Sequence, residues 1–75
     1  MIRSFSDLIS RWPSIGAYAD DMGLKYVTAQ MQRYRDSIPA TYWPAVVKVA
    51  KKRGISGVTL ELLASLAADR ASRAA

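Results

Sequence analysis

Residues 14–35 have the sequence SIGAYADDMGLKYVTAQMQRYR, and this stretch decides the fold that we expect for the whole chain. It predicts two short helices joined by a tight turn. Ala19 is small enough for close helix packing, and Gly23 suits a left-handed turn. Leu24 then packs back on the helix before it. This order is typical of a helix-turn-helix, which places its second helix in the DNA major groove.

The composition indicates a single small globular domain over residues 1–75. The chain is 51% hydrophobic and 23% charged, and it contains neither cysteine nor histidine. The lack of cysteine excludes disulfides and thiolate metal sites, and the lack of histidine removes the usual general base. There is also no glycine-rich phosphate loop. We therefore expect no enzyme activity, no metal and no cofactor.

The hydropathy pattern predicts a soluble, cytoplasmic protein that does not enter a membrane. No apolar run approaches the roughly 18 residues of a membrane span. The first residues, MIRSFSDLIS, lack the long apolar core of a signal peptide.

The net charge of +5 is concentrated in the middle of the chain. Residues 25–53 hold seven basic residues and one acidic residue, whereas the remainder is slightly acidic. Such a block suits a polyanion, since each neutralised phosphate releases counterions. A solubilising surface is the alternative interpretation of the charge alone.

Two helices are expected up to Gly23. Ser4 and Ser14 are their candidate N-caps, and Pro13 separates them. The first carries one apolar stripe at helical spacing, made of Phe5, Leu8, Ile9 and Trp12. The neighbouring carboxylates Asp20 and Asp21 should form an exposed acidic face of the second helix.

A fourth helix is expected to start between residues 40 and 42, so that Pro44 lies in its first turn, and to end at Gly54. Ile38 should be buried in the core between the third and fourth helices. The apolar stripe of this helix is Trp43, Val46, Val47 and Ala50. Lys48, Lys51, Lys52 and Arg53 lie off that stripe, and the last three should form a solvated helix end.

Thr59 is the candidate cap of a fifth helix with a wide leucine surface. Leu60, Leu63 and Ala67 line one side of it. Leu62 and Leu66 lie partly around the helix from them. Either the helix is buried on two sides, or part of it meets another copy of the protein, in which case the exposed leucines, Leu62 and Leu66, form a homodimer interface. Residues 70–75 should fray.

The third predicted helix, from about residue 25 to Arg35, carries side chains that pair with bases and phosphates. It has no acidic residue before Asp36. The candidate DNA-binding residues on it are Lys25, Tyr26, Thr28, Gln30, Gln32, Arg33 and Arg35.

The corner residues, together with Ser37-Ile38-Pro39 and the later Trp43, resemble the lambda-repressor-like fold of Cro and CI-type phage repressors. They especially resemble small Cro-like proteins of bacteria and prophages, and the resemblance covers about residues 5–66. The resemblance implies an all-α domain of five short helices that binds operator DNA, usually as a dimer. It also implies that Tyr26, Val27, Gln30 and Met31 occupy the outward positions of the reading helix.

Two rotational registers of the third helix remain open. In the family register Ala29 and Gln32 take the inward positions, although the family usually keeps larger apolar groups there. In the other register Val27, Met31 and Tyr34 form a buried stripe. The outward residues would then be Lys25, Thr28, Gln32, Arg33 and Arg35.

The sequence thus predicts a transcriptional regulator that binds double-stranded DNA sequence-specifically, as a homodimer on a pseudo-palindromic site. The alternative is a small helical interaction module, antitoxin-like or a phage accessory protein, whose basic face meets an acidic protein.

Overall fold

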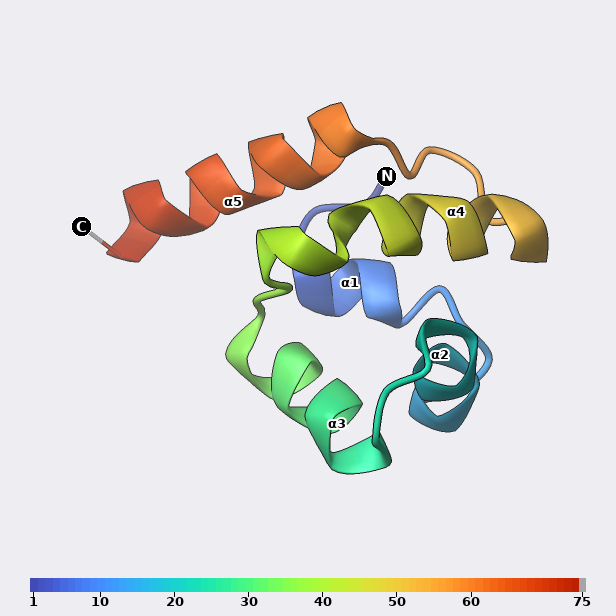
Figure 1. The fold of residues 1–75 in the computed structure, drawn as a ribbon. Coiled ribbons are helices and arrows are strands. Elements are labelled where there is room, and N and C mark those ends of the chain that lie inside the picture. Colours follow the sequence, from blue (N-terminus) through green and yellow to red (C-terminus); the bar gives the residue numbers. More distant parts are fainter. Residues whose placement is uncertain (75) are drawn as a thin grey trace.

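The computed structural model describes residues 1–74, and over that range the chain is all-helical (Figure 1). Its elements are α1 (Phe5–Ile9), α2 (Ile15–Met22), α3 (Tyr26–Arg35), the 3-10 helix η1 (Ala40–Tyr42), α4 (Trp43–Arg53) and α5 (Leu60–Ala74). The predicted all-α fold of five helices is confirmed for this range. None of these helices combines the length and the apolar character needed to cross a bilayer.

Three of the helices begin where a serine or threonine caps them. The hydroxyl oxygens accept hydrogen bonds from amide groups three residues on: Ser4 from Asp7 at 2.9 Å, Ser14 from Ala17 at 3.0 Å and Thr59 from Leu62 at 3.0 Å. These bonds satisfy amides that a helix start leaves without partners. The predicted starts of α1, α2 and α5 are therefore confirmed.

Helices α2, α3 and α4 end in the same way, with one residue in the left-handed conformation. These residues are Gly23 (φ 68°), Asp36 (φ 53°) and Gly54 (φ 83°). The next amide in each case reaches back five residues: Leu24 to the Ala19 carbonyl, Ser37 to Gln32 and Ile55 to Ala50, at 2.9–3.0 Å. This is the Schellman arrangement, and glycine adopts it most easily. Both predicted glycine ends are confirmed, whereas Asp36 takes the same conformation with a side chain.

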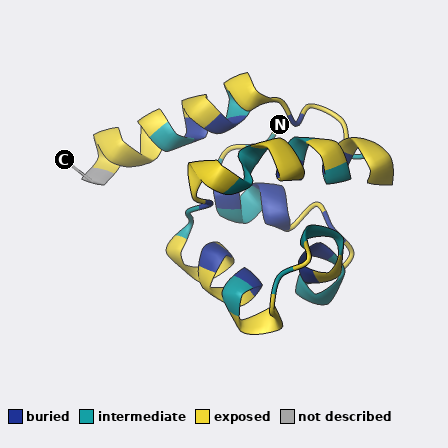
Figure 2. Cartoon of the chain, viewed as in Figure 1, coloured by how far each residue is buried: buried dark blue, intermediate teal, exposed yellow. Residues whose placement is uncertain are grey.

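The core lies where α1 meets the other helices, between α3 and α4 in the view of Figures 1 and 2. The stripe predicted for the first helix is buried throughout, since Phe5, Leu8, Ile9 and Trp12 are at most 3% exposed. The helix itself is shorter than expected, because α1 ends at Ile9 and Trp12 lies in the turn that follows. Ile38 is buried as expected. Trp43 is half-buried, stacks on Phe5 with ring centroids 6.4 Å apart and donates from Nε1 to the Ile38 carbonyl at 2.8 Å.

Helix α5 packs on the core with a different face from the one expected. Leu63 and Leu66 are buried, Leu62 is half-buried against the core, and Leu60 is 52% exposed. The packed face is centred between Leu63 and Leu66, so Leu60 falls at its margin. The prediction that Leu66 is exposed and belongs to a dimer interface is therefore wrong, because the monomer's own core covers Leu66.

The C-terminal half of α5 extends beyond the core and remains helical to Ala74, past the point at residue 70 where we expected fraying to begin (Figure 1). Two arginines tie this half to the end of α3. Arg70 donates to the Arg35 carbonyl at 3.4 Å, and Arg73 pairs with Asp36 at 3.7 Å. Residue 75, included in the expected frayed end, lies outside the described residues.

Candidate nucleic-acid interface

The corner between α2 and α3 is built from small residues and a three-residue turn, residues 23–25. Helix α3 packs against both α1 and α2. Ala19 on α2 and Ala29 on α3 are 3% and 0% exposed, and each side chain is a single methyl group, which permits close packing of the helices. Leu24, expected to be buried after the turn, is half-buried against the core.

A buried hydrogen bond sets the rotation of α3 about its axis. The hydroxyl of Tyr18 on α2 donates to Oε1 of Gln32 at 2.7 Å. Tyr18 is fully buried and Gln32 is 6% exposed. Burial raises the pKa of the Tyr18 hydroxyl, so it keeps its proton and remains a donor. Gln32 is therefore inward because a buried hydroxyl on α2 needs a partner there.

The register of α3 is the one in which Ala29 and Gln32 face inward. The alternative register is wrong: Val27, Met31 and Tyr34 are exposed, at 59%, 37% and 86%. The prediction that Gln32 contacts DNA is also wrong, since Tyr18 holds its side chain inside. The hydroxyl of Tyr18, placed on the apolar face of α2, was the sequence signal for a polar partner opposite.

The other predicted site residues mostly lie on the surface of α3. Tyr26, Gln30, Arg33, Arg35 and the preceding Lys25 are exposed, and Thr28 is half-buried at the margin. We use the name α3 face for the exposed residues Tyr26, Val27, Gln30, Met31 and Tyr34. At about 100° per residue, Val27, Gln30 and Tyr34 lie near its centre, and Arg33 and Arg35 lie on opposite flanks.

An open hollow of about 540 Å³ joins this face to the start of α2. Its lining includes Ile15, the first residue of α2, together with Gln30 and Arg33 of α3 and Ser6 of α1. The hollow places an arginine beside a helix N-terminus. Sequence reasoning found Gln30 and Arg33 but missed Ser6 and Ile15, because their nearness to α3 depends on how the helices pack.

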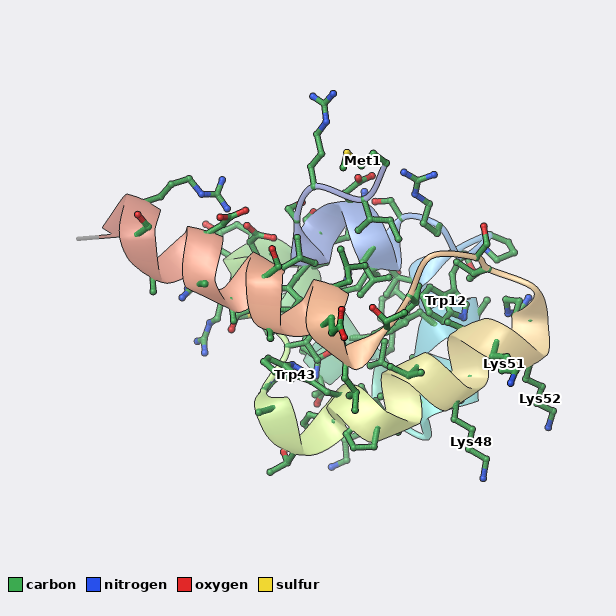
Figure 3. The ribbon with its side chains drawn as sticks, turned by 90° about the horizontal axis from the view of Figure 1, so that it is seen from above. Met1, Trp12, Trp43, Lys48, Lys51 and Lys52 are labelled. Atoms are coloured by element: carbon green, nitrogen blue, oxygen red, sulfur yellow. The ribbon has the colours of Figure 1, made fainter. Side chains whose placement is uncertain are left out.

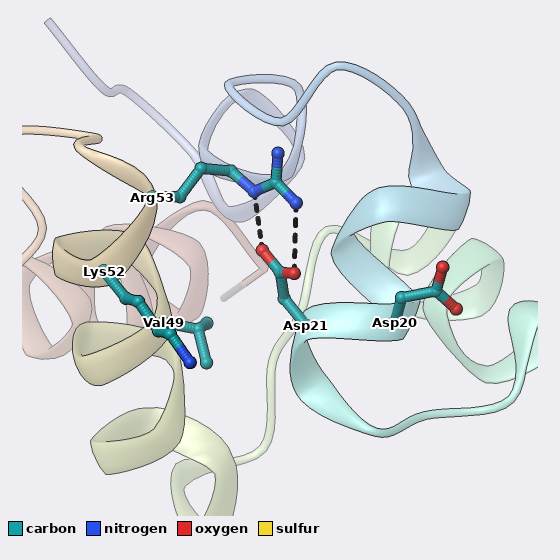
Figure 4. Close-up of a pocket in the computed structure, with 5 residues that line it drawn as sticks. All are labelled: Asp20, Asp21, Val49, Lys52 and Arg53. Carbon is teal, nitrogen blue, oxygen red and sulfur yellow. Dashed lines mark hydrogen bonds and ion pairs between the residues drawn. The ribbon is translucent and has the colours of Figure 1, made fainter.

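The carboxylate of Asp21 does not belong to an exposed acidic face, which corrects the prediction for this residue. It accepts from Nε and Nη2 of Arg53, at 2.6 and 3.0 Å, and from Nε1 of Trp12 at 2.8 Å. The bonds from Arg53 and then Trp12 lower the pKa of Asp21 to about 2. Figure 4 shows this pair at the edge of an open hollow of about 470 Å³, with the exposed Asp20 pointing away from Arg53.

The positive charge of residues 25–53 is divided between two surfaces. Lys25, Arg33 and Arg35 accompany α3, whereas Lys48, Lys51 and Lys52 are exposed on α4. Lys48 and Lys52 project from α4 away from α1 and α5 (Figure 3). Arg53 was expected in the solvated end of α4, but its guanidinium is bound by Asp21. Among the described residues, neither Lys25 nor Arg33 forms a salt bridge.

Comparison of the chain with models of known protein families, with curated protein sequences and with solved structures finds no match. Any inference of function therefore depends on the α3 face and on the charges around it.

Proposed function

We propose that this chain binds double-stranded DNA sequence-specifically and acts as a transcriptional regulator of the Cro and repressor type, with α3 in the major groove. The observation that carries the proposal is the α3 face, an exposed helix surface with an amide and two phenol groups and an arginine on each flank. An α-helix fits the width of the major groove, and its exposed side chains then meet base edges.

The charge around α3 favours a polyanion. Lys25, Arg33 and Arg35 are exposed, and residues 25–35 contain no acidic residue. The acid that follows, Asp36, accepts from the Ser6 amide at 2.9 Å and pairs with Arg73. Arginines on the two flanks of a helix in the groove lie toward the phosphates on either side, while Gln30 lies toward the bases.

The hollow between α2 and α3 suits a backbone phosphate. The start of α2 presents amide groups and the positive end of the helix dipole, and Arg33 borders the same space. An arginine and backbone amides together can hold a phosphate by charge-assisted hydrogen bonds. This contact would position the domain on the duplex without reading its sequence.

The proposal includes a cytoplasmic homodimer on a pseudo-palindromic site, because one domain of this size contacts few base pairs. Leu66 takes no part in the dimer interface, since it belongs to the monomer core.

The test is a titration of a fluorescently labelled duplex of random sequence with the protein at several salt concentrations, with fluorescence anisotropy as the measure of binding. We expect the logarithm of the affinity to fall linearly with the logarithm of the salt concentration. Arg33→Ala should weaken binding on every sequence and reduce that slope by about one.

Two matched controls remove one positive charge elsewhere. Arg11 lies beside Ser56 and Gly57, and Lys48 lies on α4, so neither belongs to the α3 face. Arg11→Ala and Lys48→Ala should leave the slope unchanged. Equal effects of all three variants would indicate nonspecific attraction to the whole protein and would contradict the assignment to α3.

The interaction module remains the second candidate, and the apolar part of the α3 face is the observation that favours it. Val27 and Tyr34 would then meet an apolar surface with an acidic rim on a protein partner. The absence of duplex binding at low salt, even to random DNA, would overturn the DNA proposal in favour of this one.

A further inference from the structure

The α3 face is unusually apolar for an exposed surface. Within residues 1–74, six large hydrophobic side chains are exposed, and four of them are Tyr26, Val27, Met31 and Tyr34 on this one helix. The other two, Met1 and Leu60, lie elsewhere in the chain. Isolated exposed hydrophobic residues are ordinary, whereas a group on one helix face indicates a contact surface.

Val27 and Met31 are the aliphatic part of that group. They are four residues apart, so their side chains are neighbours on the helix surface. Neither is needed by the helix itself: a β-branched valine is a poorer helix former than alanine, and Val27 is 59% exposed. Gln30 stands next to them, and Arg33 and Arg35 flank the face.

The proposed groove contains only one apolar group that could meet these two side chains. Along the major-groove edges of the bases, thymine alone carries a methyl group, on C5, and the other features there are hydrogen-bond donors and acceptors. Pressing Val27 or Met31 against a donor or acceptor would remove its water without giving it a partner. A thymine methyl has no such cost.

We propose that Val27 and Met31 read thymine C5-methyl groups, so that the preferred site has thymines opposite these residues. This inference rests on the proposed DNA binding and adds the base that the apolar part of the α3 face recognises. Gln30 lies beside the two aliphatic side chains and can bond both N6 and N7 of an adjacent adenine. The recognised core is therefore rich in A·T pairs of defined orientation.

The experiment starts with selection of a binding site from a random duplex pool. Each thymine of the selected site is then replaced, one at a time, by deoxyuridine, which lacks only the methyl group and pairs in the same way. Affinity is measured at one fixed salt concentration. We expect about a fourfold loss at one or two thymines, the effect of one buried methyl group, and no loss at the other thymines.

The variants assign the effect to side chains. Val27→Ala or Met31→Ala should weaken binding to the thymine duplex. Each should also abolish the difference in affinity between the thymine and deoxyuridine duplexes at the thymine that the replaced residue contacts. Both residues are exposed, so circular dichroism should show an unchanged fold. Gln30→Ala is the matched control: it should weaken binding but preserve the thymine-to-deoxyuridine ratio.

The outcomes separate this inference from the proposed function. Duplex binding that is insensitive to every deoxyuridine replacement would overturn the methyl reading and leave DNA binding standing. A ratio that survives both Val27→Ala and Met31→Ala would overturn the assignment to these residues. No binding to any duplex would overturn the proposed function itself.

Discussion

The hydroxyl of Tyr18 on α2 donates a 2.7 Å hydrogen bond to the side-chain oxygen of Gln32 on α3, in the interior of the domain. Fourteen residues separate the partners in sequence. The bond places Gln32 inward and, through the helix period, turns Val27, Gln30 and Tyr34 outward. One buried contact thus determines which side chains the proposed reading helix presents.

Breaking this bond from either side should destabilise the domain. Tyr18→Phe leaves the Gln32 amide without its partner, and Gln32→Leu leaves the Tyr18 hydroxyl buried and unpaired. Each should lower the free energy of unfolding by about 1–3 kcal/mol. The double variant should lose less than the sum of the two, since both polar groups are then gone. Urea unfolding measures all three, and strict additivity would contradict the coupling.

Asp36 should tolerate asparagine better than alanine. Its backbone is left-handed (φ 53°), and its Oδ1 accepts from the Ser6 amide in the first turn of α1. Asp36→Ala removes this cap, which is worth about 0.5–2 kcal/mol. Alanine would also have to adopt the left-handed conformation, in which a residue with a Cβ loses about 1–2 kcal/mol. Asp36→Gly loses the same cap and, like Asp36→Ala, the ion pair with Arg73, but it has no such backbone cost. Asp36→Asn keeps an acceptor. Chemical unfolding should rank stability as Asn, then Gly, then Ala. Equal losses for Gly and Ala would show that the backbone conformation contributes nothing.

Acid should weaken the domain through Asp21. The bonds from Arg53 and Trp12 lower the pKa of Asp21 from its ordinary 3.8 to about 2. A lowered pKa in the folded state means that the stabilisation is complete above about pH 4 and disappears as the pH falls toward 2. Two-dimensional NMR of the side-chain carboxyl carbons should show that Asp21 titrates with a midpoint at about pH 2.

The neighbouring carboxylate supplies the control for this titration. Asp21→Asn should reduce the dependence of the unfolding free energy on pH between 4 and 2, leaving the part that comes from Asp7, whose pKa is also lowered, whereas Asp20→Asn should not reduce it. Asp20 is exposed and points away from Arg53. A wild-type curve that Asp21→Asn does not change would contradict the role of the pair.

Leu66→Ala should unfold the domain much more readily than Leu60→Ala. Leu66 is 4% exposed within the core, and truncation of such a leucine costs about 2–5 kcal/mol through lost burial and the cavity left behind. Leu60 is 52% exposed, so its truncation should cost about 0.5 kcal/mol or less. Thermal unfolding followed by circular dichroism compares them. A Leu66→Ala protein that keeps full stability but changes its oligomeric state would contradict the core assignment and would indicate that Leu66 lies in a subunit interface.

The sequence by itself determined where α1, α2 and α5 begin and where α2 and α4 end, whereas α1 ends at Ile9, earlier than Pro13 indicated, and α4 begins at Trp43, after the 3-10 helix. Ser4, Ser14 and Thr59 cap amides three residues away, and Gly23 and Gly54 end helices through bonds that span five residues. The stripe of α1 follows from the helix period alone. These features involve neighbours in the chain, so local propensity and spacing are sufficient to predict them.

Only the tertiary structure decided which faces of those helices meet. The rotation of α3 depends on Tyr18 and Gln32, and the use of Asp21 depends on Arg53, 32 residues away. Asp36 accepts a hydrogen bond from the amide of Ser6, 30 residues away in sequence. Helix α5 buries Leu63 and Leu66 and leaves Leu60 exposed. The selection came from satisfying buried polar groups and filling the core, which are properties of the packed helices together rather than of any one segment.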